Sequence, residues 1–219
     1  MLFFNKVNLT NIFKYFFIHN GESTLIHSII VFKIAEQLAI LLNLNQETIQ
    51  DLKYACLLHD IGKLAIPEEI LNKKEPLNRD EYELIKAHAI IGYKILSEMK
   101  LYKIRDIAAF HHEKLNGKGY PFGLTAKEIS LEIRLLTISD IVSALLYERP
   151  YKEAFQKEEI IEILHSMIDN NEIDKDITVL LINNYDLIIY NAEHNLGLIN
   201  QYNKFKYQLQ EEKEDQLYF

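Results

Sequence analysis

The sequence predicts an all-α protein that folds as a single domain. Only seven glycines and four prolines occur in 219 residues, too few for the many turns of a β-sandwich or barrel. Good helix formers such as Leu, Ile, Glu, Lys and Ala are abundant, and apolar residues recur at spacings of three and four in several stretches. The chain is long enough to bury a sizeable core, and neither an internal repeat nor a change of composition divides it.

The first half of the chain opens with two helices that are predicted from their caps. Thr24 is placed to cap a helix that runs to about residue 44, with His27 in its first turn. Asn45 is placed to cap the next helix, which is expected to end near His59. Both stretches show the apolar spacing of a helix that packs on a core.

A short connection and a longer helix follow. Gly62 marks the exit from the second helix, and one short turn is expected at residues 68–71. Asn78 and Glu81 form a capping-box pattern, with Asn in place of the usual Ser or Thr. The helix that they open is expected to reach about residue 99, and His88 lies on its apolar face.

A glycine-rich loop stands in the middle of the chain. A short helix over residues 104–112 is expected to end in the pair His111-His112. The next segment, residues 113–123, contains three of the seven glycines together with Tyr, Pro and Phe. Because these apolar residues can anchor the segment, we expect a structured loop and not a linker.

The helix after this loop carries an aspartate on its apolar face. Thr125 and Glu128 repeat the capping-box pattern for a single turn, and Ser130 opens a helix that is expected to reach Glu148. Asp140 shares a face with apolar residues, where an unpaired carboxylate is costly to bury. A metal ion would compensate this cost, and a salt bridge or a cap would do so equally well.

The remaining sequence completes the predicted organisation. Two further helical patterns cover residues 157–167 and 176–190, and a charged stretch closes the chain. We therefore expect an N-terminal helical extension at residues 1–23, a helical domain at 24–191 and a charged helical tail at 192–219.

Composition excludes several classes of function. The net charge of −8 disfavours binding to polymeric nucleic acid, which needs a basic face. The single cysteine, Cys56, cannot form an internal disulfide, so we expect a reducing, cytoplasmic compartment. No stretch has ~18 uninterrupted apolar residues, and no small-residue cleavage site is present, so neither a membrane span nor a signal peptide is expected.

Histidines and aspartates recur along the predicted helices in a pattern that suggests a metal site. Each is ambiguous alone, because a histidine on an apolar face is more often a satisfied core residue. Together they number seven and lie near helix ends or on inward faces: His27, His59, Asp60, His88, His111, His112 and Asp140. Imidazole and carboxylate ligands without thiolate suit iron, manganese, zinc or nickel. Seven donors are too many for one tetrahedral ion, so the pattern predicts two metals with one bridging carboxylate.

A pair of metal ions suits the hydrolysis of phosphate esters, and nearby cations would help to bind such a substrate. Lys63 follows His59 by four residues, and Lys118 lies in the glycine-rich loop. Arg149 and Lys152 follow the Asp140 helix. For each lysine alone, a solvated surface charge is the simpler interpretation. Arg149, held beside a proline, is the best phosphate clamp because of its planar guanidinium.

The chain resembles the HD-GYP domain, a bacterial branch of the HD phosphohydrolase superfamily. The resemblance covers residues 24–163 and agrees in order and spacing. It is carried by His27-Ser28, His59-Asp60-Ile61-Gly62-Lys63, Ile66 to Asn72, His88 with Ile91-Gly92, His111-His112-Glu113, Gly117 to Pro121, Ser139-Asp140 and Arg149 to Lys152.

The resemblance implies an all-helical HD-type domain with a dinuclear metal site in its helical core. It also implies a phosphodiesterase that opens cyclic di-GMP to pGpG, and often onward to GMP. One metal would be held by His27, His59 and Asp140, and the other by His88, His111 and His112, with Asp60 bridging. Iron or manganese is the expected metal, with zinc, nickel or magnesium as alternatives.

The resemblance assigns further roles around the metals. Lys63 would sit beside the nucleophilic water and the scissile phosphate, and would polarise the transition state or assist proton transfer. Tyr120 would line the substrate groove. Arg149 and Lys152 would bind phosphate.

Three positions depart from the family pattern. Ser23 stands where some members have a glutamate that allows a third metal, so a dinuclear site is expected. Asn116 and Ser143 stand where carboxylates are usual, which puts the catalytic rate in doubt more than metal binding. Two alternatives therefore stay open: a phosphohydrolase of another nucleotide, and a degenerate domain that binds a cyclic dinucleotide or a partner without turnover. About 23 residues precede the match, so regulation is expected from a homodimer or a separate protein.

Overall fold

The fold is all-helical in the part of the chain that the computed structural model describes, residues 5–146 and 154–194. The helices follow the chain as α1 (Asn5–Leu41), α2 (Gln46–Leu58), the 3₁₀ helix η1 (Ile61–Ala65), α3 (Glu68–Leu71), α4 (Arg79–Glu98), α5 (Tyr102–Ala109), α6 (Leu131–Leu146), α7 (Lys157–Asp169), α8 (Lys175–Asn183) and α9 (Tyr185–His194). Between residues 5–146 and 154–194, the only extended pairing is an isolated bridge from Asn116 to Thr125. The predicted all-α fold is confirmed.

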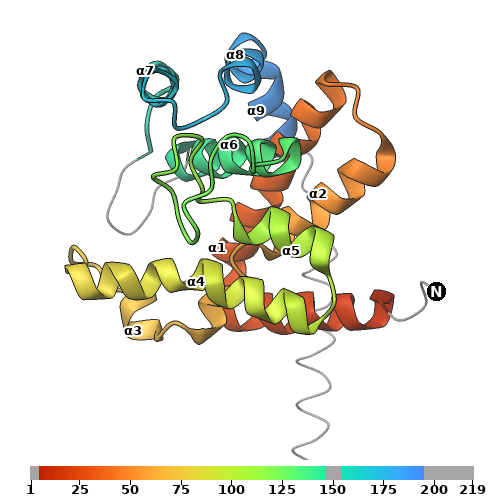
Figure 1. The fold of residues 1–219 in the computed structure, drawn as a ribbon, viewed down its shortest axis with the longest axis vertical. Helices are drawn as coiled ribbons and strands as arrows, with labels where there is room; N and C mark the ends of the chain where they lie inside the picture. Colours follow the sequence, from red (N-terminus) through yellow and green to blue (C-terminus); the bar gives the residue numbers. More distant parts are fainter. Residues whose placement is uncertain (1–4, 147–153, 195–219) are drawn as a thin grey trace, which may run out of the picture.

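Helix α1 is the central element of the molecule. It contacts α2, η1, α6, α8 and α9, while α4 packs on η1 and α5. In Figure 1, α4 and α3 lie at one end of the molecule, α7 and α8 lie at the other, and α6 lies between them. The side chains of Ile29, Ile34 and Leu38 on α1 are fully buried. Burial of this apolar stripe stabilises the arrangement by removing apolar surface from water.

One stretch of α1, Ser23–Leu41, is long and apolar enough to cross a membrane by length and composition. The sequence analysis expected no stretch of this length and hydropathy, and this expectation is corrected. In the fold, 56% of the stretch is buried, and its contacts with α2 and α6 give its apolar side chains a packing role. This is weak evidence for a membrane span.

Two of the predicted capping signals are confirmed. Asn45 accepts a hydrogen bond from the backbone N–H of Thr48 at 2.9 Å and so caps α2. Asn78 and Glu81 form a reciprocal capping box at the start of α4. These caps satisfy N–H groups that have no partner within the helix.

Several predicted helix limits are wrong. The short helix expected over residues 104–112 is α5, which ends at Ala109, before the pair His111-His112. Thr24 does not start a helix, because α1 begins at Asn5 and passes through it, so His27 lies well inside the helix. Burial of Phe16 in the core stabilises the part of α1 that precedes Thr24. The pattern over residues 176–190 is divided into α8 and α9, because the Asn184 side chain donates to the Leu180 carbonyl and ends α8 there.

The predicted domain limits stay predictions. The boundary between residues 23 and 24 falls inside α1. Of the predicted C-terminal tail, residues 195–219 lie outside the described part of the chain.

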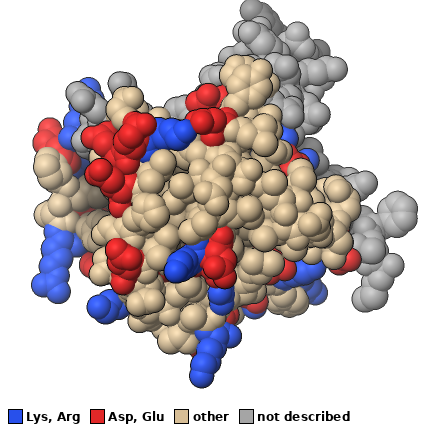
Figure 2. Space-filling model, turned by 90° about the horizontal axis from the view of Figure 1, so that it is seen from above, with Lys and Arg blue, Asp and Glu red and all other residues tan. Residues whose placement is uncertain are grey.

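Charged side chains are distributed in both signs over the surface. Figure 2 shows a face on which acidic and basic side chains are interspersed around a broad, largely uncharged area. A binder of polymeric nucleic acid would concentrate Lys and Arg into a continuous stripe. The expected absence of such a partner stays a prediction.

Candidate metal centre

The structure brings the seven predicted ligand residues to one place from five segments. His27 comes from α1, His88 from α4 and Asp140 from α6, while the pairs His59-Asp60 and His111-His112 follow the ends of α2 and α5. Their donor atoms fall into three overlapping groups, each within 4.8 Å: His27, His59 and Asp60; His59, His111 and Asp140; and His88, His111 and His112. Together the three groups contain all seven residues and no other residue of the described chain.

Asp60 lies between two sets of histidines. Its Oδ2 is 3.3 Å from Nε2 of His59, and its Oδ1 is 3.5 Å from Nε2 of His88. Each carboxylate oxygen therefore faces a different part of the cluster. Although burial raises the pKa of Asp60, the neighbouring Lys63 and His59 outweigh it and hold that pKa well below its usual value. The carboxylate is therefore ionised, with one oxygen facing His59 and the other facing His88.

Backbone carbonyls orient three of the histidine rings. Nδ1 of His59, His88 and His111 lies 2.7, 2.7 and 2.5 Å, respectively, from the carbonyl oxygen of the residue three positions earlier. A carbonyl only accepts hydrogen bonds, so Nδ1 carries the proton in each ring. In the neutral ring Nε2 is then unprotonated, which is the form that binds a metal.

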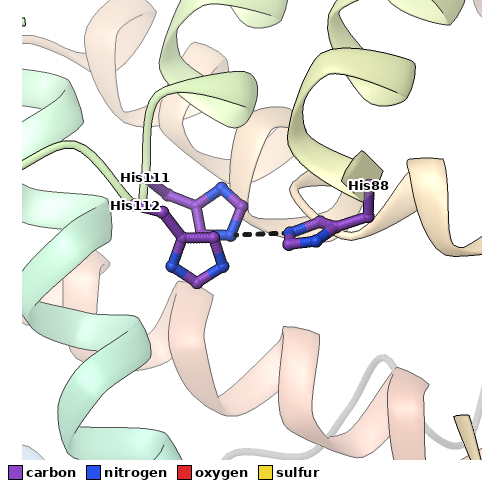
Figure 3. A group of neighbouring side chains, drawn as sticks. All are labelled: His88, His111 and His112. Carbon is purple, nitrogen blue, oxygen red and sulfur yellow. Dashed lines mark hydrogen bonds between the residues drawn. The ribbon is translucent and has the colours of Figure 1, made fainter. Parts of the chain in front are cut away.

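The orientation of the His88 and His111 rings brings their two Nε2 atoms close together. Their Nε2 atoms approach to 3.5 Å, and Figure 3 shows this contact with His112 beside it. As neutral rings with protons on Nδ1, both present a lone pair to the other, so they cannot hydrogen-bond to each other through Nε2. A cation bound by both nitrogens would satisfy both lone pairs.

Burial keeps most of the rings neutral. It lowers the pKa of His27 and His88, lowers that of His111 well below its usual value and lowers that of His112 to about 4. His59 differs, because Asp60 and Asp140 outweigh the effect of burial and raise its pKa. Nitrogen and carboxylate donors without thiolate, mostly in their metal-binding protonation state, fit a pair of divalent cations.

Close backbone contacts bring the segments together. A Cβ on Gly62 would lie 1.9 Å from the carbonyl oxygen of His88, so only glycine allows η1 to approach α4 here. The expected role of Gly62 as the exit of a helix is corrected: α2 ends at Leu58, and Gly62 lies inside η1. The close approach places Asp60 beside His88.

Glu113 holds the glycine-rich loop in place, a role that the sequence analysis did not assign to it. Its side chain is buried, and its carboxylate accepts backbone N–H bonds from Phe122 at 2.6 Å, Gly123 at 3.2 Å and Leu124 at 2.9 Å. A Cβ on Gly119 would lie 2.4 Å from the Cα of Glu113. The loop is thus held against the residue next to His112, and adjacency to the histidine pair was the available signal.

The loop places an aromatic side chain beside the cluster. The ring of Tyr120 stacks on that of His112, with 4.6 Å between centroids and 29° between planes. Lys86, which the sequence analysis did not single out, has its Nζ 5.1 Å from the centroid of the Tyr120 ring. Tyr120 therefore lies at the cluster, as its predicted role requires.

The predicted catalytic and substrate lysines differ in their relation to the cluster. Lys63 contacts Asp60 directly, with Nζ 2.6 Å from Oδ2. Lys118 is exposed, and its backbone N–H donates to Asn116 within the loop. Arg149 and Lys152 lie outside the described residues.

The three departures from the family pattern take defined places. Ser23 is exposed on α1. Asn116 joins the loop to the end of α7, because its Nδ2 donates to the Asn170 carbonyl at 2.9 Å. Ser143 is buried on α6, with its Oγ 2.9 Å from Nδ1 of His27.

Comparison with known proteins agrees with this geometry. The family described as HD domain matches residues 11–177. The cyclic di-GMP phosphodiesterase response regulator RpfG of Xanthomonas campestris is 40% identical over 136 residues, which cover 61% of this chain and 35% of RpfG. The 3′3′-cGAMP-specific phosphodiesterase 1 of Vibrio cholerae is 35% identical over 174 residues, which cover 79% of this chain and 39% of that protein. The chain thus spans little more than a third of the length of these two relatives.

Solved structures share the fold. An HDG"Y"P protein from Bdellovibrio bacteriovorus matches with a TM-score of 0.62 at 24% identity, over 77% of this chain and 56% of that chain. The HD domain of the L. monocytogenes phosphodiesterase PgpH, solved in complex with cyclic di-AMP, matches with a TM-score of 0.58 at 22% identity, over 85% and 96% of the two chains. At these identities the likeness concerns the fold alone.

Proposed function

Because the chain belongs to the HD domain family, and within it to the HD-GYP branch, we propose that it is a metal-dependent phosphodiesterase that opens a cyclic dinucleotide. The leading substrate is cyclic di-GMP, opened to linear pGpG and then onward to GMP. The names of the relatives support a cyclic dinucleotide as the substrate class, since both cyclic di-GMP and 3′3′-cGAMP occur among them.

The position of Asp60 is the observation that carries the proposal. Its two carboxylate oxygens face Nε2 atoms of two different histidines, His59 and His88. Such a carboxylate suits a bridge between two cations. We assign His27, His59 and Asp140 to one cation and His88, His111 and His112 to the other. The donor groups support the second set, which is one of them, whereas the members of the first set are spread over the two other groups.

The proposed chemistry is hydrolysis of a phosphodiester. A bound pair of divalent ions would supply a water of lowered pKa and positive charge for the phosphoryl oxygens. The five imidazoles and two carboxylates hold and orient that pair. Lys63 adds a cationic side chain beside Asp60, where it can stabilise charge that develops on the scissile phosphate or donate a proton.

Tyr120 is assigned to the substrate base. Its ring is fixed by stacking on His112, and an aromatic face of this kind can bind a purine by stacking. Lys118, Arg149 and Lys152 are assigned to phosphate, with Arg149 as the principal clamp. For these three the assignment rests on the sequence pattern.

Iron or manganese is the proposed metal. Nitrogen-rich ligand sets with carboxylates suit either ion, and they also accept zinc or nickel. The proposal includes a cytoplasmic location, which the single buried Cys56 supports. Control by a homodimer contact or by a separate regulator is part of the same proposal.

The test pairs metal analysis with turnover. Protein purified without oxygen is assayed for iron and manganese, then incubated separately with cyclic di-GMP, 3′3′-cGAMP and cyclic di-AMP, and the products are separated by chromatography. Two equivalents of metal with a linear dinucleotide as product are expected. Faster opening of 3′3′-cGAMP would change the substrate within the class. Tight binding with two metals and no product would favour a receptor without turnover, and protein without metal would contradict the site.

A further inference from the structure

Lys86 lies beside the Tyr120 ring, two residues before His88 on α4. Its Nζ is 5.1 Å from the centroid of the Tyr120 ring and 5.8 Å from that of the Tyr82 ring. Two aromatic rings therefore attract the ammonium group, and the Lys86 side chain is only 26% exposed. Because the Tyr120 ring stacks on His112, this ammonium group lies next to the proposed metal centre.

Glu83 places a carboxylate against the same ammonium group. Its two oxygens lie 3.0 and 3.1 Å from Nζ of Lys86, which follows Glu83 by three residues on α4. The Glu83 side chain is 58% exposed, so its oxygens are accessible to a ligand. An exposed ion pair adds little to stability, but this one presents a hydrogen-bond donor and an acceptor side by side near an aromatic ring.

A donor and an acceptor beside an aromatic ring can recognise a purine. Proteins bind bases that lie outside a double helix by stacking them on aromatic rings and by hydrogen-bonding their Watson–Crick edges. That edge of guanine carries the acceptor O6 and then the donors N1–H and N2–H₂. Adenine carries the donor N6–H₂ in place of O6 and an unprotonated N1 in place of N1–H. Lysine only donates and an ionised glutamate only accepts, so Lys86 complements O6 and Glu83 complements N1–H and N2–H₂.

The Glu83 carboxylate favours a base over a phosphate as the partner of Lys86. A phosphate that approached Nζ of Lys86 would come close to the negative charge of Glu83 and would be repelled. Guanine is neutral and offers donors to that carboxylate. The flexible four-carbon stem of lysine allows the ammonium group to move to the edge of a base that stacks on Tyr120.

We propose that Glu83 and Lys86 recognise guanine and determine the base specificity of the site, with Tyr120 as the ring on which this base stacks. The inference rests on the proposed phosphodiesterase function and deepens it, because it selects cyclic dinucleotides that contain at least one guanine. Cyclic di-GMP and 3′3′-cGAMP meet this requirement, and cyclic di-AMP does not.

The experiment measures base preference with and without turnover. The Mn²⁺-loaded full chain is titrated in a calorimeter with hydrolysis-resistant bisphosphorothioate analogues of cyclic di-GMP and cyclic di-AMP. In parallel, kcat/KM is measured for the two natural compounds. The wild type is expected to favour the guanine compound by about 10- to 100-fold in both measurements, the range for a good two-point contact to a base.

Single substitutions remove one partner of guanine at a time. Lys86→Met keeps an unbranched side chain but cannot donate, so it should reduce the preference about 10-fold by weakening the guanine compound alone. Glu83→Gln keeps one acceptor oxygen and should reduce the preference to a smaller extent. Lys94→Met and Glu98→Gln change exposed positions of the same helix and should retain the wild-type preference.

A double variant separates recognition from an effect on structure. Glu83→Lys combined with Lys86→Glu keeps an ion pair between the two positions but exchanges the donor and the acceptor. Because the ribose fixes the direction of the base, the exchanged pair should favour the adenine compound. A purely structural ion pair would leave the preference unchanged.

The outcomes separate this inference from the proposed function. A wild type that binds both analogues equally, or a Lys86→Met variant with the wild-type preference, would contradict the inference and leave the phosphodiesterase proposal intact. Equal weakening of both analogues in Lys86→Met would also overturn the inference and would assign Lys86 to phosphate. A wild type that opens neither compound would contradict the proposed function, and its calorimetric preference would still decide whether guanine is recognised. Binding of neither analogue would contradict both.

Discussion

The Lys63 ammonium nitrogen lies 2.6 Å from Oδ2 of Asp60, across the first turn of η1. The side chain of Asp60 is 4% exposed and that of Lys63 29% exposed, so the lysine extends from the buried carboxylate toward solvent. Within residues 5–146 and 154–194, Lys63 is the only lysine or arginine that contacts Asp60, the proposed bridging ligand. A substrate phosphate that approaches the cluster would meet this charge.

Replacing Lys63 by Gln is expected to reduce kcat by a factor of about 10² to 10³, because a charge that stabilises the transition state is removed. Metal content should stay at two equivalents, since Lys63 donates no ligand atom. Steady-state kinetics and metal analysis on the same preparation check both statements. Lys94→Gln, an exposed position on α4, is the control, and an unchanged kcat in Lys63→Gln would remove Lys63 from the mechanism.

Asp60→Ala is expected to abolish turnover and to release metal, because neither cation would retain its shared anionic ligand. Asp60→Asn preserves the volume but lacks the negative charge, and should also lose metal. Elemental analysis after gel filtration measures the loss. Wild-type metal content in either variant would show that Asp60 does not bridge.

Glu113→Gln is expected to loosen the loop that carries Tyr120. Glutamine keeps one oxygen, which can still accept from Phe122 and Gly123, but its NH₂ cannot accept the bond that the second carboxylate oxygen takes from the Leu124 N–H. Loss of a hydrogen bond to a charged group costs about 1.5–3 kcal/mol, so Tm should fall by about 5 °C. KM for the cyclic dinucleotide should rise, since Tyr120 is no longer held in place.

The control for this prediction is Glu69→Gln, an exposed residue of α3. It should leave both Tm and KM within error of the wild type. A Glu113→Gln variant with lowered Tm and unchanged KM would limit Glu113 to a role in stability.

The free energy of unfolding of the chelator-treated protein should decrease as the pH is lowered from 6.5 to about 4. Burial lowers the pKa of His112 to about 4, so in this window the unfolded state binds a proton that the folded state does not. The free energy of unfolding therefore rises with pH, and His112 contributes at most about 3 kcal/mol above pH 6.5, which is lost as the pH falls toward 4.

Urea unfolding at several pH values measures this effect. In His112→Gln the number of protons taken up on unfolding should fall by about one, which reduces the slope by roughly 1.4 kcal/mol per pH unit. The raised pKa of His59 acts in the opposite direction, so the test is the difference between variant and wild type. Equal slopes would contradict a buried neutral His112.

The set of histidines and aspartates that cluster and the start of two helices could be predicted from the sequence alone. The Asn45 cap and the capping box of Asn78 with Glu81 depend on groups three residues apart, so local sequence determines them. The order and spacing of the histidines and aspartates likewise pointed to a cluster, because each fell on an inward face or at a helix end.

Tertiary packing decided what local pattern could not. Helix α1 begins before Thr24 because Phe16 is buried in the core. This stabilisation depends on residues distant in the sequence, so no local pattern predicts it. The two-sided position of Asp60, the three bonds to Glu113 and the hydroxyl of Ser143 at His27 join atoms from different segments. Helical periodicity predicts which face of a helix turns inward, but the packing of one helix on another sets which atoms meet there. The sequence by itself thus determined an all-helical chain and the seven residues proposed as ligands, while only the tertiary structure decided that these residues meet in one cluster and that Asp60 lies between His59 and His88.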